Sequence, residues 1–158
     1  MANPNAFLFL TSRLRDEAYR FLTDELDQHG LTGLTPTHGA ILSMLFIHDI
    51  LPMGKLANLI GKDKSTVTAL VKKLIDLGYV KRKTDPEDMR VTKVRLTSKA
   101  QSVAPLLMEI SGRLRKTAYQ GLSRAEQMML VELLERVIKN FASDTEQNPF
   151  WLNDLKCR

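Results

Sequence analysis

The chain has 158 residues, a net charge of +5 at pH 7 and 44% hydrophobic residues. This length fits one domain or a compact domain with helical extensions, and the apolar content excludes the disordered class. The single cysteine, Cys157, excludes an internal disulfide and a cysteine metal cluster, and favours a reduced, cytoplasmic protein. Uninterrupted apolar runs are far too short to cross a bilayer, so no membrane association is expected.

Basic residues are concentrated in the middle of the chain. Between residues 53 and 99 there are twelve Lys or Arg and five acids, a local balance of +7 in a chain whose total is +5. A basic block within an otherwise slightly acidic chain favours a localised site for a polyanion. A basic surface that faces solvent without a partner is the alternative.

The first predicted helix starts at Asn3 and Pro4, a typical helix start, and apolar residues at helical spacing continue to about Gln28. Residues 7–10 are apolar on every side of this helix, whereas a surface helix needs only one apolar face. We expect a second subunit or the chain's own tail to cover them.

Three further helices are predicted over about residues 36–48, 53–60 and 62–78. Thr35 and Asp63 are the expected N-caps of the first and third, while Gly61 forms a turn and Gly78 a C-terminal stop. A helix, a short helix, a glycine turn and a second helix make a helix-turn-helix arrangement.

The helix at 62–78 has two different faces. Apolar residues at steps of three and four define one face: Val67, Leu70, Val71, Leu74 and Leu77. The other face is small, hydroxyl-bearing and basic: Ser65, Thr66, Thr68, Ala69, Lys72 and Lys73. A helix with such a face suits the major groove of DNA. An ordinary surface helix with a solvated face is the alternative.

A β-hairpin is predicted directly after this helix. Residues 79–83 and 91–96 have strand character, and the polar segment 84–90 forms the tip. Arg90 stands near the tip, where a guanidinium can enter the minor groove. Asp88 can orient this arginine through a charge-assisted bond, and Lys93 lies on the second strand. A solvated turn is the alternative for this segment.

Two more helices complete the chain. Thr97 and Ser98 begin one that contains Pro105, and a capping box from Ser123 to Glu126 begins the last. The expected fold is mainly α, with about six helices and a small β-hairpin wing. We divide the chain into an N-terminal dimerisation helix (1–33), a winged helix-turn-helix DNA-binding domain (34–97) and C-terminal dimerisation helices with a tail (98–158).

Motifs for catalysis are missing from the sequence. It has no glycine-rich phosphate loop, no nucleophile elbow and no Cys-His pair at a nucleophile spacing. The three histidines are not at metal-chelating intervals from one another or from other ligands. We therefore expect no enzymatic activity, no metal and no cofactor.

The run from about Leu34 to Lys99 resembles the MarR family of winged helix-turn-helix regulators. The most specific motif is Asp85-Pro86-Glu87-Asp88-Met89-Arg90, followed by Val94-Arg95-Leu96-Thr97. Other matching segments are Leu34-Thr35-Pro36-Thr37, Lys55-Leu56-Ala57, residues 65–74 and Leu77-Gly78-Tyr79-Val80. Many members carry Gly at the position of Ala100 and a second Arg at that of Met89, so this wing tip has a single arginine.

The resemblance implies a homodimer formed by the first and the last two helices. It also implies that Ser65, Thr66, Thr68 and Lys72 contact the major groove, that Arg90 enters the minor groove and that Asp88 orients Arg90. Family members commonly bind small aromatic or anionic effectors between the dimerisation helices and the winged domain. By position, the residues expected in such a cleft are Arg13 or Arg15, His38 and Met44. Packing in the core is the alternative role for Met44.

The predicted function is a homodimeric, ligand-responsive transcription regulator, a repressor, that binds double-stranded DNA at a pseudo-palindromic operator. Cations on the basic block are expected to contact phosphates: Lys55, Lys62, Lys64, Lys73, Lys81, Arg82 and Lys93. The alternative is a winged-helix module that uses the basic face for a protein partner.

Overall fold

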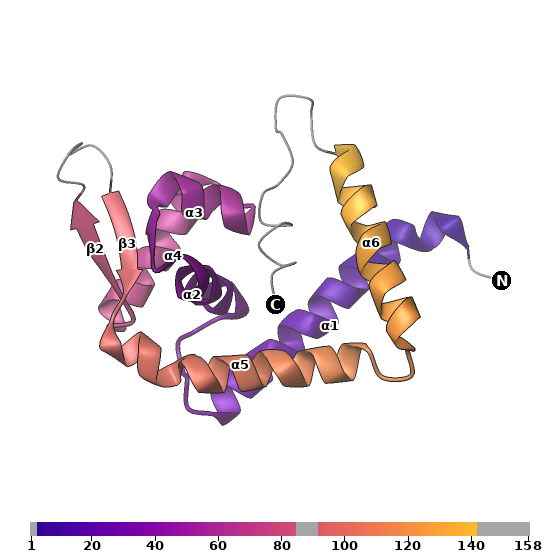
Figure 1. The fold of residues 1–158 in the computed structure, drawn as a ribbon, viewed down its shortest axis with the longest axis horizontal. Helices are drawn as coiled ribbons and strands as arrows, with labels where there is room; N and C mark the ends of the chain where they lie inside the picture. Colours follow the sequence, from indigo (N-terminus) through magenta and orange to yellow (C-terminus); the bar gives the residue numbers. More distant parts are fainter. Residues whose placement is uncertain (1–2, 85–91, 142–158) are drawn as a thin grey trace.

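The computed structural model describes residues 3–84 and 92–141 of the chain (Figure 1). Six α-helices dominate this part, together with one short 3-10 helix and three short strands, so the predicted fold class is confirmed. In chain order the elements are η1 Pro4–Ala6, α1 Phe7–Gln28, α2 Pro36–His48, β1 Ile50–Pro52, α3 Met53–Ile60, α4 Lys64–Asp76, β2 Val80–Thr84, β3 Thr92–Leu96, α5 Ser98–Ala118 and α6 Arg124–Phe141.

Side-chain caps fix where α2, α4, α5 and α6 begin, as the sequence predicts. The Thr35 side chain accepts from the His38 amide at the start of α2, and the Thr97 side chain accepts from the amide of Ala100 at the start of α5. At the start of α6, Glu126 accepts from the Ser123 amide at 2.8 Å, which forms the expected capping box. Each cap satisfies an amide that helical geometry leaves without a partner.

The sheet has a strand that the sequence did not indicate. β3 lies between β1 and β2 and is antiparallel to both, so the wing is three-stranded rather than a simple hairpin. β1 is three residues long and ends in proline, so it carries no alternating pattern. The chain turns into it at Asp49, whose φ of 56° is the only positive value at a non-glycine residue within the described part. Arg95 of β3 lies 3.7 Å from the Asp49 carboxylate.

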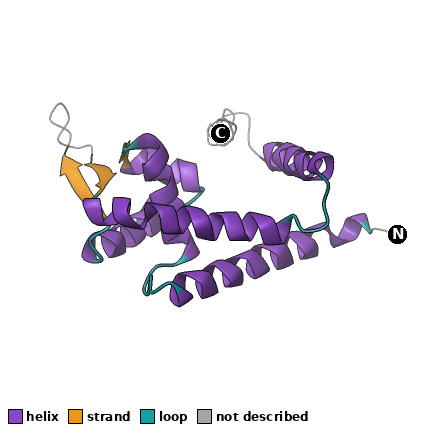
Figure 2. Ribbon diagram, turned by 60° about the horizontal axis from the view of Figure 1, so that its bottom comes forward, coloured by secondary structure: helices purple, strands orange, loops and turns teal. Residues whose placement is uncertain are grey.

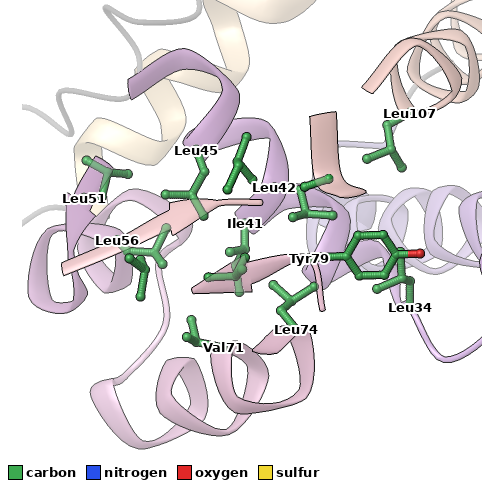
Figure 3. Close-up of a cluster of buried hydrophobic side chains, with 14 of the residues drawn as sticks. Leu34, Ile41, Leu42, Leu45, Leu51, Leu56, Val71, Leu74, Tyr79 and Leu107 are labelled. Atoms are coloured by element: carbon green, nitrogen blue, oxygen red, sulfur yellow. The ribbon is translucent and has the colours of Figure 1, made fainter. Parts of the chain in front are cut away.

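One hydrophobic core joins the helix-turn-helix, the sheet and the start of α5 (Figure 3). Its fully buried side chains include Ile41, Leu42, Leu45, Leu56, Val67, Val71, Leu74, Val80 and Val94. Burying a side chain of this size contributes roughly 1.5–3 kcal/mol. Because α4 supplies three of these side chains, the core fixes the orientation of that helix.

α5 leaves the winged domain and runs along α1 (Figures 1 and 2). Leu26 of α1 and Ile110 of α5 are buried, and Arg113 of α5 lies 3.3 Å from the Glu25 carboxylate of α1. Pro105 lies inside α5, as the sequence predicts.

Apolar side chains are left uncovered at the end of the molecule away from the sheet, where α6 and the start of α1 lie (Figure 1). Among the described residues, α6 has no buried side chain. Leu8 is 77% exposed and Phe141 is 80% exposed. We refer to these side chains as the α1/α6 apolar surface: Phe7, Leu8, Phe9, Leu10, Leu14, Met128, Met129, Leu130, Val131, Leu133, Ile138 and Phe141.

Candidate nucleic-acid interface

α4 presents the polar face that its sequence predicts. Val67, Val71 and Leu74 are fully buried on the inner side. The residues expected in the major groove are all exposed: Ser65, Thr66, Thr68, Ala69 and Lys72, with Lys73 beside them. The buried side of α4 therefore anchors the helix, and its short polar and basic side chains face solvent.

The turn before α4 sets where the helix begins. Gly61 adopts a left-handed conformation with φ 61°, which residues with a β-carbon rarely adopt. The amide of Lys62 then donates to the Ala57 carbonyl at 3.1 Å, which closes the end of α3. Asp63 follows at once as the N-cap of α4. This short connection fixes the angle between the two helices of the motif.

The Asp63 carboxylate accepts three hydrogen bonds from the first turn of α4. It accepts from the Thr66 amide at 2.8 Å, from the Thr66 hydroxyl at 2.6 Å and from the Ser65 hydroxyl. The bonds from Ser65 and then Thr66 hold the pKa of this carboxyl well below its usual range. Asp63 is therefore ionised at any physiological pH. The sequence indicates Asp63 as a cap, but not that it binds both hydroxyls.

The C-terminal end of α4 is capped both by main-chain amides and by a lysine side chain. Gly78 has φ 78°, and the amides of Gly78 and Tyr79 donate to carbonyls of the last turn at 2.8 and 2.9 Å. Lys99 donates through Nζ to the carbonyl of Leu77 at 2.7 Å and lies 4.5 Å from the centre of the Tyr79 ring. Lys99 belongs to the basic block of the sequence, which did not indicate this role.

Most of the predicted phosphate contacts lie on α3, on α4, on the turn before α4 and on β2. Lys55, Lys62, Lys64, Lys73, Lys81 and Arg82 are all exposed, as phosphate contacts require. Lys72 of α4 lines one hollow with Lys81 and Arg82 of β2, so the helix and the wing present cations side by side. Asp76 also lines this hollow.

The wing strands continue this basic surface. Lys83 of β2 lies opposite Lys93 of β3 in the sheet, and Lys93 is half-buried. Lys83 is exposed and was not among the predicted contacts, although its place in a run of three cations was a usable signal. Arg90 and Asp88, the residues predicted at the wing tip, lie outside the described residues.

The predicted effector residues fall in different places. Met44 lines a hollow between α1, α2 and α3, together with Ala40, Leu59 and Ile60. A second, more polar hollow lies next to it. Its lining is Arg15, Asp16, Arg20 and three residues that also line the first: Tyr19, Thr37 and Lys62. We call the two hollows together the α1–α2–α3 cleft.

His38 and Arg13 do not line this cleft. His38 is 5% exposed, and its Nδ1 accepts from the Thr35 amide at 3.0 Å as part of the α2 cap. Burial, and then the charge of Lys73, lower the pKa of the His38 ring. Arg13 is exposed and pairs with Glu17 at 3.2 Å.

Neither a metal centre nor a membrane span is found in the part of the chain that the structure describes. Within residues 3–84 and 92–141, no three His, Cys, Asp or Glu side chains converge as ligands. None of the described helices is both long and apolar enough to cross a bilayer.

Comparison with known proteins places the chain in a family. The model of the MarR family matches residues 34–92. Over 142 residues the chain is 30% identical to the HTH-type transcriptional regulator SarZ of Staphylococcus epidermidis, which covers 89% of this chain and 91% of SarZ. The chain belongs to the MarR family. The resemblance stated from the sequence is therefore confirmed.

Further comparisons give similar matches. The chain is 28% identical over 109 residues to the uncharacterized HTH-type transcriptional regulator YdgJ of Bacillus subtilis. This match covers 69% of the chain but 66% of YdgJ, so the chain spans just under two thirds of that relative. A mutant MarR from E. coli, solved in complex with operator DNA, matches with a TM-score of 0.75 and 19% identity over 86% of this chain and 99% of that one. At this identity the match establishes the shared fold.

Proposed function

We propose that this MarR-family protein regulates transcription by binding double-stranded DNA as a homodimer, with α4 of each protomer in a major groove. The observation that carries the proposal is the exposed face of α4, where three hydroxyls and two lysines stand opposite the buried Val67, Val71 and Leu74. Its relatives' names, and the operator DNA bound to the E. coli protein, support it. Repression of a target gene is the mode of action that we propose.

The cations around α4 supply the sequence-independent part of binding. Each phosphate that a lysine or arginine neutralises releases counterions, and the logarithm of the affinity falls by about 0.9 per phosphate for each unit of log salt. The proposed phosphate contacts are Lys55, Lys62, Lys64, Lys73, Lys81, Arg82 and Lys93. The proposed wing contacts are Arg90 in the minor groove and Asp88 as its orienting acid.

Titration of labelled duplexes into the full chain tests the proposal. We expect tight binding to a duplex from the protein's own promoter, weaker binding to random duplex, and a steep loss of both with added salt. If the protein binds no duplex at low salt, the alternative of a winged-helix module with a protein partner is favoured.

The α1/α6 apolar surface supports the proposed homodimer. Clusters of large apolar side chains rarely stay exposed on a monomer, and a second copy of the chain would bury them. A dimer also places two α4 helices on one face, about 34 Å apart, so that they reach successive major grooves of a pseudo-palindrome.

The α1–α2–α3 cleft is the proposed effector site, which revises the predicted lining. Its floor is apolar, from Met44, Leu59 and Ile60, and its rim carries cations. A small aromatic anion complements both features. Of the rim cations, Arg15 pairs with Asp16, and Arg20 pairs with Glu17. Lys62 directly precedes the α4 cap, so an anion held there would act on the start of the DNA-binding helix.

The proposed effector site is tested by measuring how far an added effector weakens DNA binding. We expect benzoate, as a simple aromatic carboxylate, to weaken promoter binding by the wild type and to do so less in Met44→Ala. Arg13→Ala, which changes a residue outside the cleft, is the matched control. A benzoate effect of equal size in all three proteins would rule out this cleft.

A further inference from the structure

The hydroxyl groups on the exposed face of α4 all make hydrogen bonds within their own helix. The Ser65 hydroxyl donates to Oδ1 of Asp63, and the Thr66 hydroxyl donates to Oδ2 at 2.6 Å. One turn further on, the Thr68 hydroxyl donates to the main-chain carbonyl of Lys64 at 2.7 Å. These are the three hydroxyls that stand among the proposed base contacts.

The direction of these bonds is fixed by the acceptors. A carboxylate and a main-chain carbonyl have no proton to give, so each hydroxyl must be the donor. Asp63 remains a carboxylate because the bonds it accepts lower its pKa. A hydroxyl has only one proton and two lone pairs, so a hydroxyl whose proton is already engaged can only accept from a further partner.

We infer that Ser65, Thr66 and Thr68 read DNA as hydrogen-bond acceptors. Asp63 is the positioning residue for Ser65 and Thr66, and the Lys64 carbonyl takes the same part for Thr68. In the major groove the donors are the exocyclic amines, N6 of adenine and N4 of cytosine. Guanine offers only acceptors there, and thymine offers an acceptor and a methyl group. This inference rests on the proposed DNA binding and specifies which base atoms α4 recognises.

A phosphate is the competing partner for these hydroxyls, and the structure disfavours it. A phosphate oxygen accepts hydrogen bonds, whereas these hydroxyls have no proton left to donate. The ionised Asp63 carboxylate also occupies the N-terminus of α4, where a phosphate would otherwise bind, and it repels a second anion. The phosphate contacts therefore fall to the lysines.

Base analogues in a bound duplex test the inference. The duplex is first selected from a random pool with the full chain. Adenine is then replaced by 2-aminopurine and cytosine by 2-pyrimidinone, one position at a time, which removes the major-groove amine. At positions under α4 we expect about two- to tenfold weaker binding, the range for loss of one hydrogen bond. In Ser65→Ala, Thr66→Val or Thr68→Val, the analogue at the matching position should cost nothing further.

The Asp63→Asn variant tests how Asp63 positions the neighbouring hydroxyls while it keeps the helix cap. Asparagine caps helices about as well as aspartate, so α4 should keep its fold. If its Oδ1 keeps the bonds from Ser65 and the Thr66 amide, its amide group faces the Thr66 hydroxyl and donates to it. The Thr66 proton is then free to point outward. We expect this variant to become less sensitive to the analogue opposite Thr66, because the freed proton can turn toward the base, and to keep its full sensitivity opposite Ser65.

Two results would overturn the inference, and they differ from each other. If binding is sequence-specific but the hydroxyl variants keep full sensitivity to every amine deletion, the acceptor role is wrong and DNA binding stands. If no duplex is selected and none binds at low salt, the proposed function fails as well. Replacing guanine by 7-deazaguanine provides the control, since the loss of N7 should affect the wild type and the hydroxyl variants equally.

Discussion

Lys99 donates a 2.7 Å hydrogen bond from Nζ to the main-chain carbonyl of Leu77, which ties the start of α5 to the end of the DNA-binding helix. The same ammonium lies over the Tyr79 ring at 4.5 Å. Although Lys99 belongs to the basic part of the sequence, it is engaged with the protein itself. A cation at this end also complements the negative end of the α4 dipole.

Lys99→Met should lower stability rather than the electrostatic part of DNA binding. Loss of the bond to Leu77 should cost about 0.5–1.5 kcal/mol of the free energy of unfolding. Each kcal/mol corresponds to a fall in Tm of roughly 2–4 °C for a chain of this size. Thermal unfolding followed by circular dichroism measures the change, and a salt titration of DNA binding should keep its slope. An unchanged Tm would contradict the capping role.

Lys73→Ala should lower the electrostatic part of DNA binding rather than stability. Lys73 is exposed on α4, and we expect it to neutralise a phosphate. Its removal should weaken specific and random duplexes about equally and flatten the salt slope by about one, the value for a single phosphate. Fluorescence anisotropy at several salt concentrations measures the slope. A weakening confined to one operator base would mean that Lys73 reads sequence instead.

Arg90→Ala should reduce specific binding by about 1–3 kcal/mol, because we propose this single guanidinium as the minor-groove contact of the wing. The measurement is a gel-shift titration with the selected operator. Met89→Ala, next to it in the wing tip, is the matched control and should have little effect. If Arg90→Ala leaves operator affinity unchanged, the wing tip does not enter the groove.

His38 makes stability depend on pH. Burial keeps the folded pKa of this ring below its ordinary value of 6.5, so the unfolded chain binds the proton more readily. The contribution of His38 to the free energy of unfolding is fully present above pH 6.5. It is lost as the pH falls from 6.5 through the lower pKa of the folded state. His38→Gln should reduce this pH dependence while keeping the α2 cap, because Gln suits the third position of a capping box. Urea unfolding at several pH values compares the two proteins.

Met129→Glu combined with Leu133→Glu should convert a dimer into a monomer. Both side chains belong to the α1/α6 apolar surface, and each added carboxylate would have to be desolvated at the interface. Light scattering gives the mass in solution. Operator affinity should fall as dimerisation is lost. Glu132→Ala, on the same helix, is the control. A wild-type chain that is already monomeric would instead favour cover by residues 142–158.

Capping residues in the sequence predicted well where the helices begin. Thr35, Asp63, Thr97 and Ser123 start the helices that they were expected to start, since a side-chain cap is formed by residues close together in the chain. The exposed and buried sides of α4 were predicted for the same reason, because helical spacing alone fixes which residues share a face.

Features that depend on distant partners were missed. β1 is defined only by its pairing with β3, where Ile50 lies opposite Arg95, and three residues carry no pattern of their own. His38 was expected to line a cleft, but packing in the folded chain leaves its side chain only 5% exposed. The cleft itself is formed by α1, α2 and α3, and its residues come together only after folding.

The position of β2 has a consequence for solubility. Because β3 takes the central place in the sheet, β2 lies at one edge, where unpaired main-chain groups can recruit a strand from another molecule. Lys81, Arg82 and Lys83 stand exposed along this edge. Three like charges in a row repel the same edge of a second molecule. Lys81 and Arg82, which are proposed to contact DNA, thus also protect the wing against edge-to-edge aggregation together with Lys83. Replacing all three with threonine should promote this aggregation.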